Sequence, residues 1–152
     1  MPNKYVSLTL DDAKKMTAAA ETKARSMGIA YCVAVVDAGG RLISFLRQDG
    51  ALIGSIDLAI DKAVTAILFD KTTSELSSLA QSGRPLFGIQ ESNGGAVVIF
   101  GGGIPVWSEG AFIGAVGASS GTVEQDVAVA EAAIAGLDLS TELFNRKRGM
   151  QT

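Results

Sequence analysis

The sequence predicts one domain of the α+β class, in which helices pack against an antiparallel five-stranded sheet. Five short apolar runs are rich in strand-forming residues, and tight turns join most of them to a neighbour. Longer stretches between them repeat apolar residues at spacings of three and four, which is typical of helices with one buried face. Neighbouring strands joined by tight turns pair antiparallel. The single domain 1–152 is long enough for one core and contains no linker or repeat.

The first helix begins at Thr9. Its hydroxyl is suited to cap the helix, and the acidic Asp11 and Asp12 follow it at the positive end of the helix dipole. Gly28 is a typical helix end. The apolar face of this helix consists of Ala13, Met16, Ala20, Ala24 and Met27. We therefore expect this helix to serve packing and not chemistry.

A hairpin follows the first helix. The runs 29–36 (IAYCVAVV) and 41–47 (RLISFLR) flank the turn 37–40 (DAGG), which is among the better local signals for paired strands. The first run is apolar throughout, and this predicts a central strand that is covered on both faces. Cys32 lies in the middle of that strand, where a small core residue is expected rather than a reactive thiolate.

A second helix is predicted over about 53–69. Its apolar stripe consists of Ile53, Ile56, Ile60, Ala63 and Ile67, and the polar residues expected away from that stripe are Ser55, Asp57, Asp61, Lys62 and Thr65. The turn before this helix contains Arg47 and Asp49. These two residues either face a ligand or stabilise the turn through their own charge pair, and both interpretations stay open.

A short helix and an irregular segment come next. Thr72 and Glu75 form a capping pattern that begins a helix to about Gln81. An irregular segment then runs to Gly95, and loops of this length often line a site or an interface.

Three strands and a last helix complete the predicted domain. The strands are expected at 96–100, 104–107 and 111–118, and Thr122 with Gln125 forms a third capping pattern. The predicted buried stripe of this last helix consists of Val123, Val127, Ala130, Ile134 and Leu137.

Composition limits the partners of the chain. Charged residues make up 19% of it, against roughly 25% in average soluble domains, and hydrophobic residues make up 47%. Such a small domain would expose much apolar surface, which predicts a homo-oligomer; a monomer rich in Ala and Gly is the alternative. The net charge is −3 and the only basic cluster is 146–148, so no nucleic-acid-binding face is expected.

The compartment is predicted from what the sequence lacks. It shows no signal peptide and no apolar run of about 20 residues that could span a bilayer. The single cysteine cannot form an internal disulfide, which fits a reducing compartment. We therefore expect a cytoplasmic protein.

The chain contains no histidine. This excludes histidine-assisted nucleophiles, histidine zinc sites and histidine haem ligation, and a lone cysteine excludes thiolate metal clusters within one chain. No metal site is expected. The candidate acid–base groups are Asp49, Lys62, Glu109 and Asp126, and each has an alternative role in a turn, at a cap or on the surface.

The glycine-rich stretch 101–121 is the candidate ligand-binding edge. Gly101, Gly102 and Gly103 are suited to an anion-binding nest of backbone N–H groups. Ser119, Ser120 and Gly121 precede a helix N-terminus that favours negative charge. Turn geometry and helix capping explain the same residues without a ligand. The full candidate set is Arg47, Asp49, Gly101, Gly102, Gly103, Glu109, Ser119, Ser120, Gly121 and Asp126.

Several motifs together carry a resemblance to a known family. In order they are VVDAGG (35–40), RQDGA (47–51), AxxKAxxA (59–66), GGGIP (101–105), GxxIGAVG (110–117) and Gln125-Asp126. Across nearly the whole chain this pattern resembles the GlcG/HbpS family, which includes the C-terminal domain of PduO-type proteins. The resemblance implies a profilin-like or PAS-like α/β sandwich with five strands, and a dimer, tetramer or octamer.

The resemblance also implies a range of ligands. Some relatives bind haem or are linked to haem degradation, and others accompany glycolate, propanediol or glycerol metabolism and cobalamin handling. The histidine ligand of the haem-binding relatives has no counterpart here, so haem would need Tyr, Met, Cys or Lys, or an unligated apolar site. A corrinoid-linked ligand is a further candidate, and the cofactor is left open.

The function expected from the sequence is that of a small-ligand or cofactor-binding accessory protein of a metabolic pathway. Two alternatives stay open. One is an enzyme that acts on a small organic acid or a tetrapyrrole, with carboxylates and Lys as catalysts. The other is an assembly protein that binds a partner encoded in the same operon.

Overall fold

The computed structural model describes residues 1–137 of the chain. Within this range the elements are α1 (Leu10–Met27), β1 (Cys32–Asp37), β2 (Leu42–Arg47), α2 (Ser55–Phe69), α3 (Thr73–Leu79), two 3-10 turns (Ile89–Glu91 and Asn93–Gly95), β3 (Gly103–Ser108), β4 (Ala111–Ser119) and α4 (Val123–Ala135). The predicted α+β class is confirmed.

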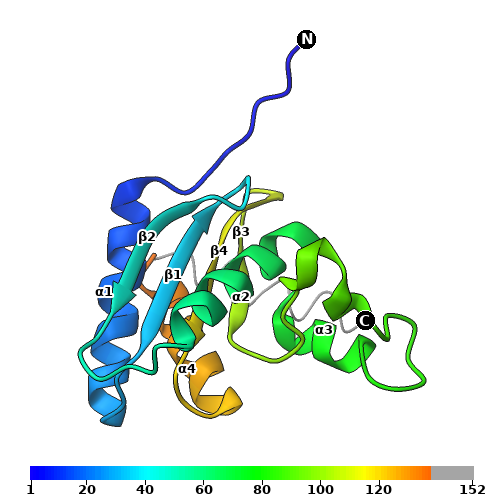
Figure 1. Cartoon of the computed structure of the whole chain (residues 1–152). Coiled ribbons are helices and arrows are strands. Elements are labelled where there is room, and N and C mark those ends of the chain that lie inside the picture. The colour runs from blue at the N-terminus through cyan, green and yellow to red at the C-terminus, as the bar shows by residue number, and fades with distance from the viewer. Residues whose placement is uncertain (138–152) are drawn as a thin grey trace, which may run out of the picture.

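Helices cover both faces of a single sheet (Figure 1). On one face, α1 lies against β1 and β2 while α4 lies against β3 and β4, and the two helices pack on each other. On the other face α2 packs against β1, β4 and β3, and the short helix α3 contacts β3 at the edge. Neither α2 nor α3 provides the main cover of β2 on this face.

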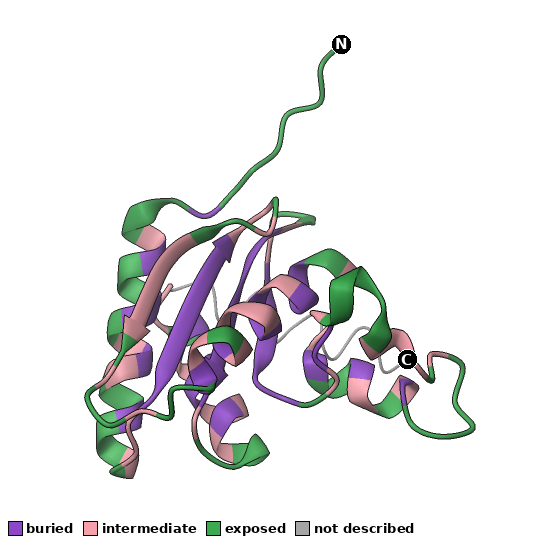
Figure 2. Cartoon of the chain, viewed as in Figure 1, coloured by how far each residue is buried: buried purple, intermediate pink, exposed green. Residues whose placement is uncertain are grey.

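The sheet has the strand order β2-β1-β4-β3, and all neighbours pair antiparallel. The predicted hairpin is the pair β1–β2. Cys32 to Val36 are fully buried, as expected for a central strand with both faces covered, and Figure 2 shows β1 as the most buried strand beside the half-exposed β2. β2 and β3 form the two edges.

The prediction of a fifth strand at 96–100 is wrong, because this segment belongs to no strand of the sheet. Its backbone groups bond to helix α2 instead: Val98 N donates to Thr65 Oγ1 at 3.1 Å, and the same hydroxyl donates to Ala96 O at 3.5 Å. Val97 and Val98 are buried by this packing. Apolar character alone thus identified a core segment but not a strand.

The predicted capping patterns are confirmed. The hydroxyls of Thr9, Thr72 and Thr122 each accept a hydrogen bond from the backbone N–H three residues later, and the side chain at that position accepts from the backbone N–H of the capping residue. Gly28 ends α1 with φ 70°, a left-handed conformation that favours glycine. These short local patterns fix where three of the helices begin.

The predicted buried stripe of α2 is partly wrong. Ile53 is 77% exposed, whereas Lys62 and Thr65, which were expected to lie away from the stripe, are buried. Helix α2 approaches the sheet so closely that a Cβ on Gly117 of β4 would overlap the Ala59 carbonyl oxygen. Ala59 and Ala63 therefore lie at the closest approach of the helix to the sheet. Ile67 is buried as predicted, whereas Ile56 and Ile60 are only half-buried against the same cluster.

The apolar core consists of two clusters, one on each face of the sheet. Cys32 lies in the cluster beneath α2 with no exposed surface, and burial raises the pKa of its thiol. The prediction of a core residue is confirmed. No helix in residues 1–137 is both long and apolar enough to cross a bilayer.

Candidate functional site

One end of the sheet brings together most of the predicted site residues. Because the strands alternate in direction, β1 and β3 begin at this end, where β2 and β4 finish. The residues gathered here are Arg47 and Asp49 at and after the end of β2, Gly101, Gly102 and Gly103 leading into β3, Ser119, Ser120 and Gly121 at and after the end of β4, and Asp126 in the first turn of α4. Glu109 lies apart, exposed in the turn between β3 and β4 at the opposite end.

A buried ion pair lies beneath this end of the sheet. Lys62 Nζ of α2 lies 2.7 Å from Asp126 Oδ2 of α4, and the two side chains are 0% and 4% exposed. The same ammonium donates to Ala118 O at 3.0 Å. Asp126 Oδ1 accepts from the Tyr31 hydroxyl at 2.9 Å and from Gly121 N at 3.0 Å. Every oxygen of the carboxylate therefore has a donor.

The environment shifts the ionisation of two members of this cluster. Burial lowers the pKa of Lys62, and the hydrogen bond and charge of Asp126 oppose that shift. Burial, together with the hydrogen bond to Asp126, raises the pKa of Tyr31. The Phe100 ring covers the ammonium with its centroid 4.9 Å from Nζ. The cluster is thus closed to solvent, and it ties α2, α4 and β4 together.

The glycines near the ion pair allow close approach. A Cβ on Gly102 would lie 2.7 Å from Ala118 O and 2.8 Å from Lys62 Nζ, so a side chain there would displace the ammonium. Gly103 N already donates to Thr73 Oγ1 at 2.9 Å. An anion bound at this N–H would have to replace that bond.

The two serines at the end of β4, Ser119 and Ser120, also have partners. Ser119 Oγ donates to Ser55 Oγ at 3.1 Å, and Ser120 Oγ accepts from Leu52 N at 3.2 Å. Both bonds connect the end of β4 to the start of α2. The polar residues of this stretch hold the chain segments at this end of the sheet together.

The convergence of Lys62, Asp126 and Tyr31 was missed by sequence reasoning, although Lys62 and Asp126 were separate candidates. A signal was present, since each charge occupies a position of a buried helical stripe. Lys62 is three residues after Ala59 and four before Ala66, both fully buried. A charge at such a position needs a buried partner. The sequence did not reveal which residue that partner is, because Lys62 and Asp126 lie far apart in the chain.

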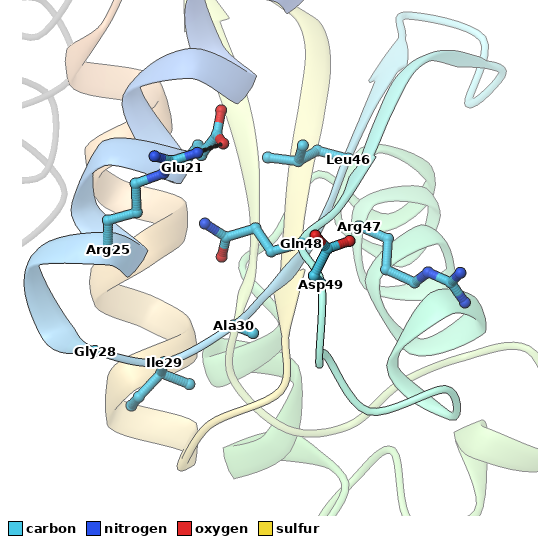
Figure 3. Close-up of a pocket in the computed structure, with 9 residues that line it drawn as sticks. All are labelled: Glu21, Arg25, Gly28, Ile29, Ala30, Leu46, Arg47, Gln48 and Asp49. Atoms are coloured by element: carbon cyan, nitrogen blue, oxygen red, sulfur yellow. Dashed lines mark hydrogen bonds and ion pairs between the residues drawn. The ribbon is translucent and has the colours of Figure 1, made fainter.

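A groove of about 480 Å³ opens beside this end of the sheet, between the C-terminal turns of α1 and the end of β2 (Figure 3). Arg25 Nη2 lies 2.6 Å from Glu21 Oε1, and Gln48 Oε1 accepts from Tyr31 N at 2.8 Å. In Figure 3 the Arg47 side chain points away from Arg25 and Glu21. The lining residues are Glu21, Arg25, Gly28, Ile29, Ala30, Leu46, Arg47, Gln48 and Asp49.

The residues of this groove do not fit a coordinated haem. None of those that line it is Tyr, Met, Cys, Lys or His. Tyr31, Cys32 and Lys62 lie nearby in the fold but are fully buried, and Tyr31 and Lys62 are hydrogen-bonded to Asp126. Within residues 1–137 no group of three Cys, Asp or Glu side chains lies close enough to hold a metal ion.

Comparison with known proteins gives consistent matches. Residues 8–135 match the model of the HbpS-like family, whose description is "Haem degrading protein HbpS-like". The chain is 44% identical over 137 residues to an uncharacterized 15.0 kDa protein in the dhaT-dhaS intergenic region of Citrobacter freundii, covering 90% of this chain and 94% of that one. It is 38% identical to the corrinoid adenosyltransferase PduO of the same organism, but the aligned region spans only 41% of PduO and 90% of this chain.

A solved structure agrees with these relatives. The crystal structure of a PduOC:heme complex superposes with a TM-score of 0.84 at 40% identity, covering 86% of this chain and 95% of that one. The resemblance found in the sequence motifs is therefore confirmed along almost all of the described chain. The chain belongs to the HbpS-like family.

Proposed function

We propose that this protein is a cytoplasmic, homo-oligomeric accessory protein that binds a small organic ligand for a metabolic pathway. The groove between α1 and the end of β2 is the proposed binding site. The observation that carries the proposal is its lining, in which charged and amide groups from two separate segments converge around apolar Ile29 and Leu46. Its volume of about 480 Å³ lies in the range typical of small-molecule sites.

The charges at the groove favour a small organic acid. Arg25 offers a guanidinium with most of its surface exposed, and guanidinium groups bind carboxylates with two parallel hydrogen bonds. In the structure this guanidinium forms an ion pair with Glu21 of the same helix. A ligand carboxylate would compete with Glu21, so we expect binding of moderate affinity.

The relatives support a role beside a pathway. One is encoded in the dhaT-dhaS region, and another matching region lies within a corrinoid adenosyltransferase. This fits a context of diol, glycerol or glycolate metabolism, or of cobalamin handling. We do not propose haem binding in this groove by analogy with the PduOC complex, because the groove lining offers no haem ligand. An enzyme that used Lys62 and Asp126 would first have to uncover them from Phe100.

Thermal unfolding with a panel of small mono- and dicarboxylates tests the proposal, since a ligand that binds only the folded state raises the melting temperature. We expect at least one acid to stabilise the wild type, and Arg25→Gln to lose that effect. Lys23→Gln is the matched control, because it removes the same charge from an exposed position on α1 outside the groove. Glu21→Gln should strengthen binding by removing the competing carboxylate.

Two outcomes would contradict the groove as the site. One is the absence of stabilisation by any acid at millimolar concentration. The other is equal stabilisation of wild type and Arg25→Gln. A parallel titration with haem tests the tetrapyrrole hypothesis independently. A shift of the Soret band at stoichiometric haem would show that haem is coordinated by a residue outside this groove, because the groove offers no haem ligand.

A further inference from the structure

The loop between α3 and β3 contains an asparagine that is followed directly by two glycines, at positions 93–95. No residue from 81 to 95 is buried, and Asn93, Gly94 and Gly95 are all exposed. Figure 2 shows this loop largely in green, the colour of exposed residues. Neither the proposed binding groove nor the buried ion pair uses these residues. Asparagine is a thermolabile residue type, because its side-chain amide can be lost by hydrolysis.

The backbone of this turn is open around the asparagine. Asn93, Gly94 and Gly95 have φ of 53°, 70° and 79°, so three consecutive residues have positive φ. Asparagine and glycine are the residues that tolerate this conformation best. A Cβ built on Gly94 would meet nothing within 4 Å, and neither would one on Gly95. Solvent therefore reaches the backbone of the turn.

The hydrogen bonds of the turn leave two groups unused. Gly95 N donates to Ser92 O at 3.0 Å, and Ala96 N donates to Asn93 O at 3.4 Å. Within residues 1–137, the N–H of Gly94 donates no hydrogen bond, and the side-chain amide of Asn93 has no hydrogen-bond partner. Because no bond holds either group in place, the nitrogen and the side-chain amide can approach each other when the turn fluctuates.

We propose that Asn93 is a site of spontaneous deamidation in the folded protein, through attack of the backbone nitrogen of Gly94 on the side-chain amide. The nitrogen loses its proton to solvent and forms a bond to Cγ. The bond from Cγ to Nδ2 breaks, and the side-chain nitrogen takes up a proton and leaves as ammonia. The product is a five-membered succinimide ring. Water then opens the ring at one of its two carbonyl carbons, which gives aspartate or isoaspartate at position 93.

The two products change the loop in different ways. Both add one negative charge to a chain whose formal net charge is −3. In isoaspartate the main chain runs through the former side chain and gains one methylene group, so the two hydrogen bonds that span this position lose their geometry. The bond from Val98 N to Thr65 Oγ1 lies beyond the turn and anchors the next segment on α2. The reaction therefore alters the loop and leaves the sheet intact.

Mass spectrometry of the full chain, stored at neutral pH and physiological temperature, tests this proposal. Cleavage after Glu91 and Glu109 isolates the peptide 92–109, in which Asn93 is the only asparagine. We expect the mass of this peptide to rise by about 1 Da in a single-exponential reaction. The rate should rise about tenfold per pH unit, because the nitrogen attacks after losing its proton.

Asn3 provides a comparison within the same molecule. It is exposed as well, but it precedes Lys4, whose side chain restricts the approach of the backbone nitrogen. Asn3 should therefore deamidate at least about tenfold more slowly than Asn93 under the same conditions. Cleavage after Glu21 places Asn3 in the separate peptide 1–21, so both rates are measured in one sample.

Two glycine substitutions form a matched pair. Gly94→Ala places a methyl group beside the attacking nitrogen and should slow the reaction about tenfold or more. Gly95→Ala adds the same group one residue later, where φ is similarly positive and the space is equally open. Its rate should stay within about threefold of the wild type. Asn93→Gln should show no conversion, because the longer side chain would have to close a six-membered ring. Circular dichroism checks that the variants are folded.

The chain unfolded in guanidinium chloride shows how far the fold itself protects the site. We expect the folded chain to react within about tenfold of the unfolded chain, since the turn is exposed and both reacting groups lack hydrogen bonds. Greater protection than this overturns the inference. So does an Asn3 that reacts as fast as Asn93, or equal deamidation of Gly94→Ala and Gly95→Ala. Each of these results would mean that the turn does not bring the Gly94 nitrogen to the Asn93 side chain.

Discussion

Removal of one member of the buried Lys62–Asp126 pair should destabilise the protein severely. Lys62→Met leaves the Asp126 carboxylate buried with only Tyr31 and Gly121 as donors, and Asp126→Asn leaves the Lys62 ammonium without its counter-charge. Breaking a buried pair costs about 3–5 kcal/mol, because no water reaches the remaining charge. That is a large part of the 5–15 kcal/mol that stabilises a typical domain.

The double variant separates the charge interaction from the loss of each side chain. Lys62→Met with Asp126→Asn removes both charges, while the amide oxygen still accepts from Tyr31 and Gly121. We expect the double variant to be about 2 kcal/mol more stable than the sum of the two single effects predicts. Lys14→Met is the control; Lys14 is exposed on α1, so its loss should change stability by about 0.5 kcal/mol or less.

Urea unfolding followed by circular dichroism measures these differences. With a slope of about 2 kcal/mol per molar urea, each single variant should lower the midpoint by roughly 1.5–2.5 M. Single variants that unfold within about 0.5 M of the wild type, or single effects that simply add in the double variant, would refute the reasoning. Either result would mean that water or another group compensates the remaining charge.

Three further predictions concern packing, capping and pH. Gly117→Ala should push α2 away from β4 and cost about 3 kcal/mol or more in thermal unfolding, whereas Gly54→Ala should be nearly neutral, because nothing lies within 4 Å of a Cβ there. Thr122→Ala should cost about 1 kcal/mol through loss of the α4 cap; an unchanged urea midpoint would contradict this. Burial raises the pKa of Cys32 above 9.0, so the unfolded thiol ionises first and stability falls as pH rises above 9. Cys32→Ala should therefore lose less stability between pH 8 and pH 10 than the wild type, and parallel curves would contradict this.

Features that depend on neighbouring residues were predictable from the sequence. The helix starts at Thr9, Thr72 and Thr122 follow from side chains within three residues of each cap, and the β1–β2 hairpin follows from its turn. The segment 96–100 was assigned wrongly because apolar character does not reveal whether a segment pairs with a strand or bonds to a helix side chain.

Features that depend on distant residues were not predictable. The buried face of α2 is decided by Gly117, which lies about fifty residues later and lets the helix approach the sheet. The Lys62–Asp126 pair joins residues 64 positions apart. The groove combines α1 with the end of β2, so its lining became visible only in the folded chain, although Arg47 and Asp49 had been singled out.

The strand order β2-β1-β4-β3 has a consequence for how the chain folds as it is synthesised. The hairpin β1–β2 emerges early, but the other neighbour of β1 is β4, at residues 111–119. Helix α1 likewise cannot complete its packing until α4, its partner on the same face, has been synthesised. A ribosome-bound chain that ends before residue 111 therefore carries a hydrophobic strand with one open edge, which is a template for association with other chains. Folding of this protein must be completed late in translation, when β4 inserts between β1 and β3.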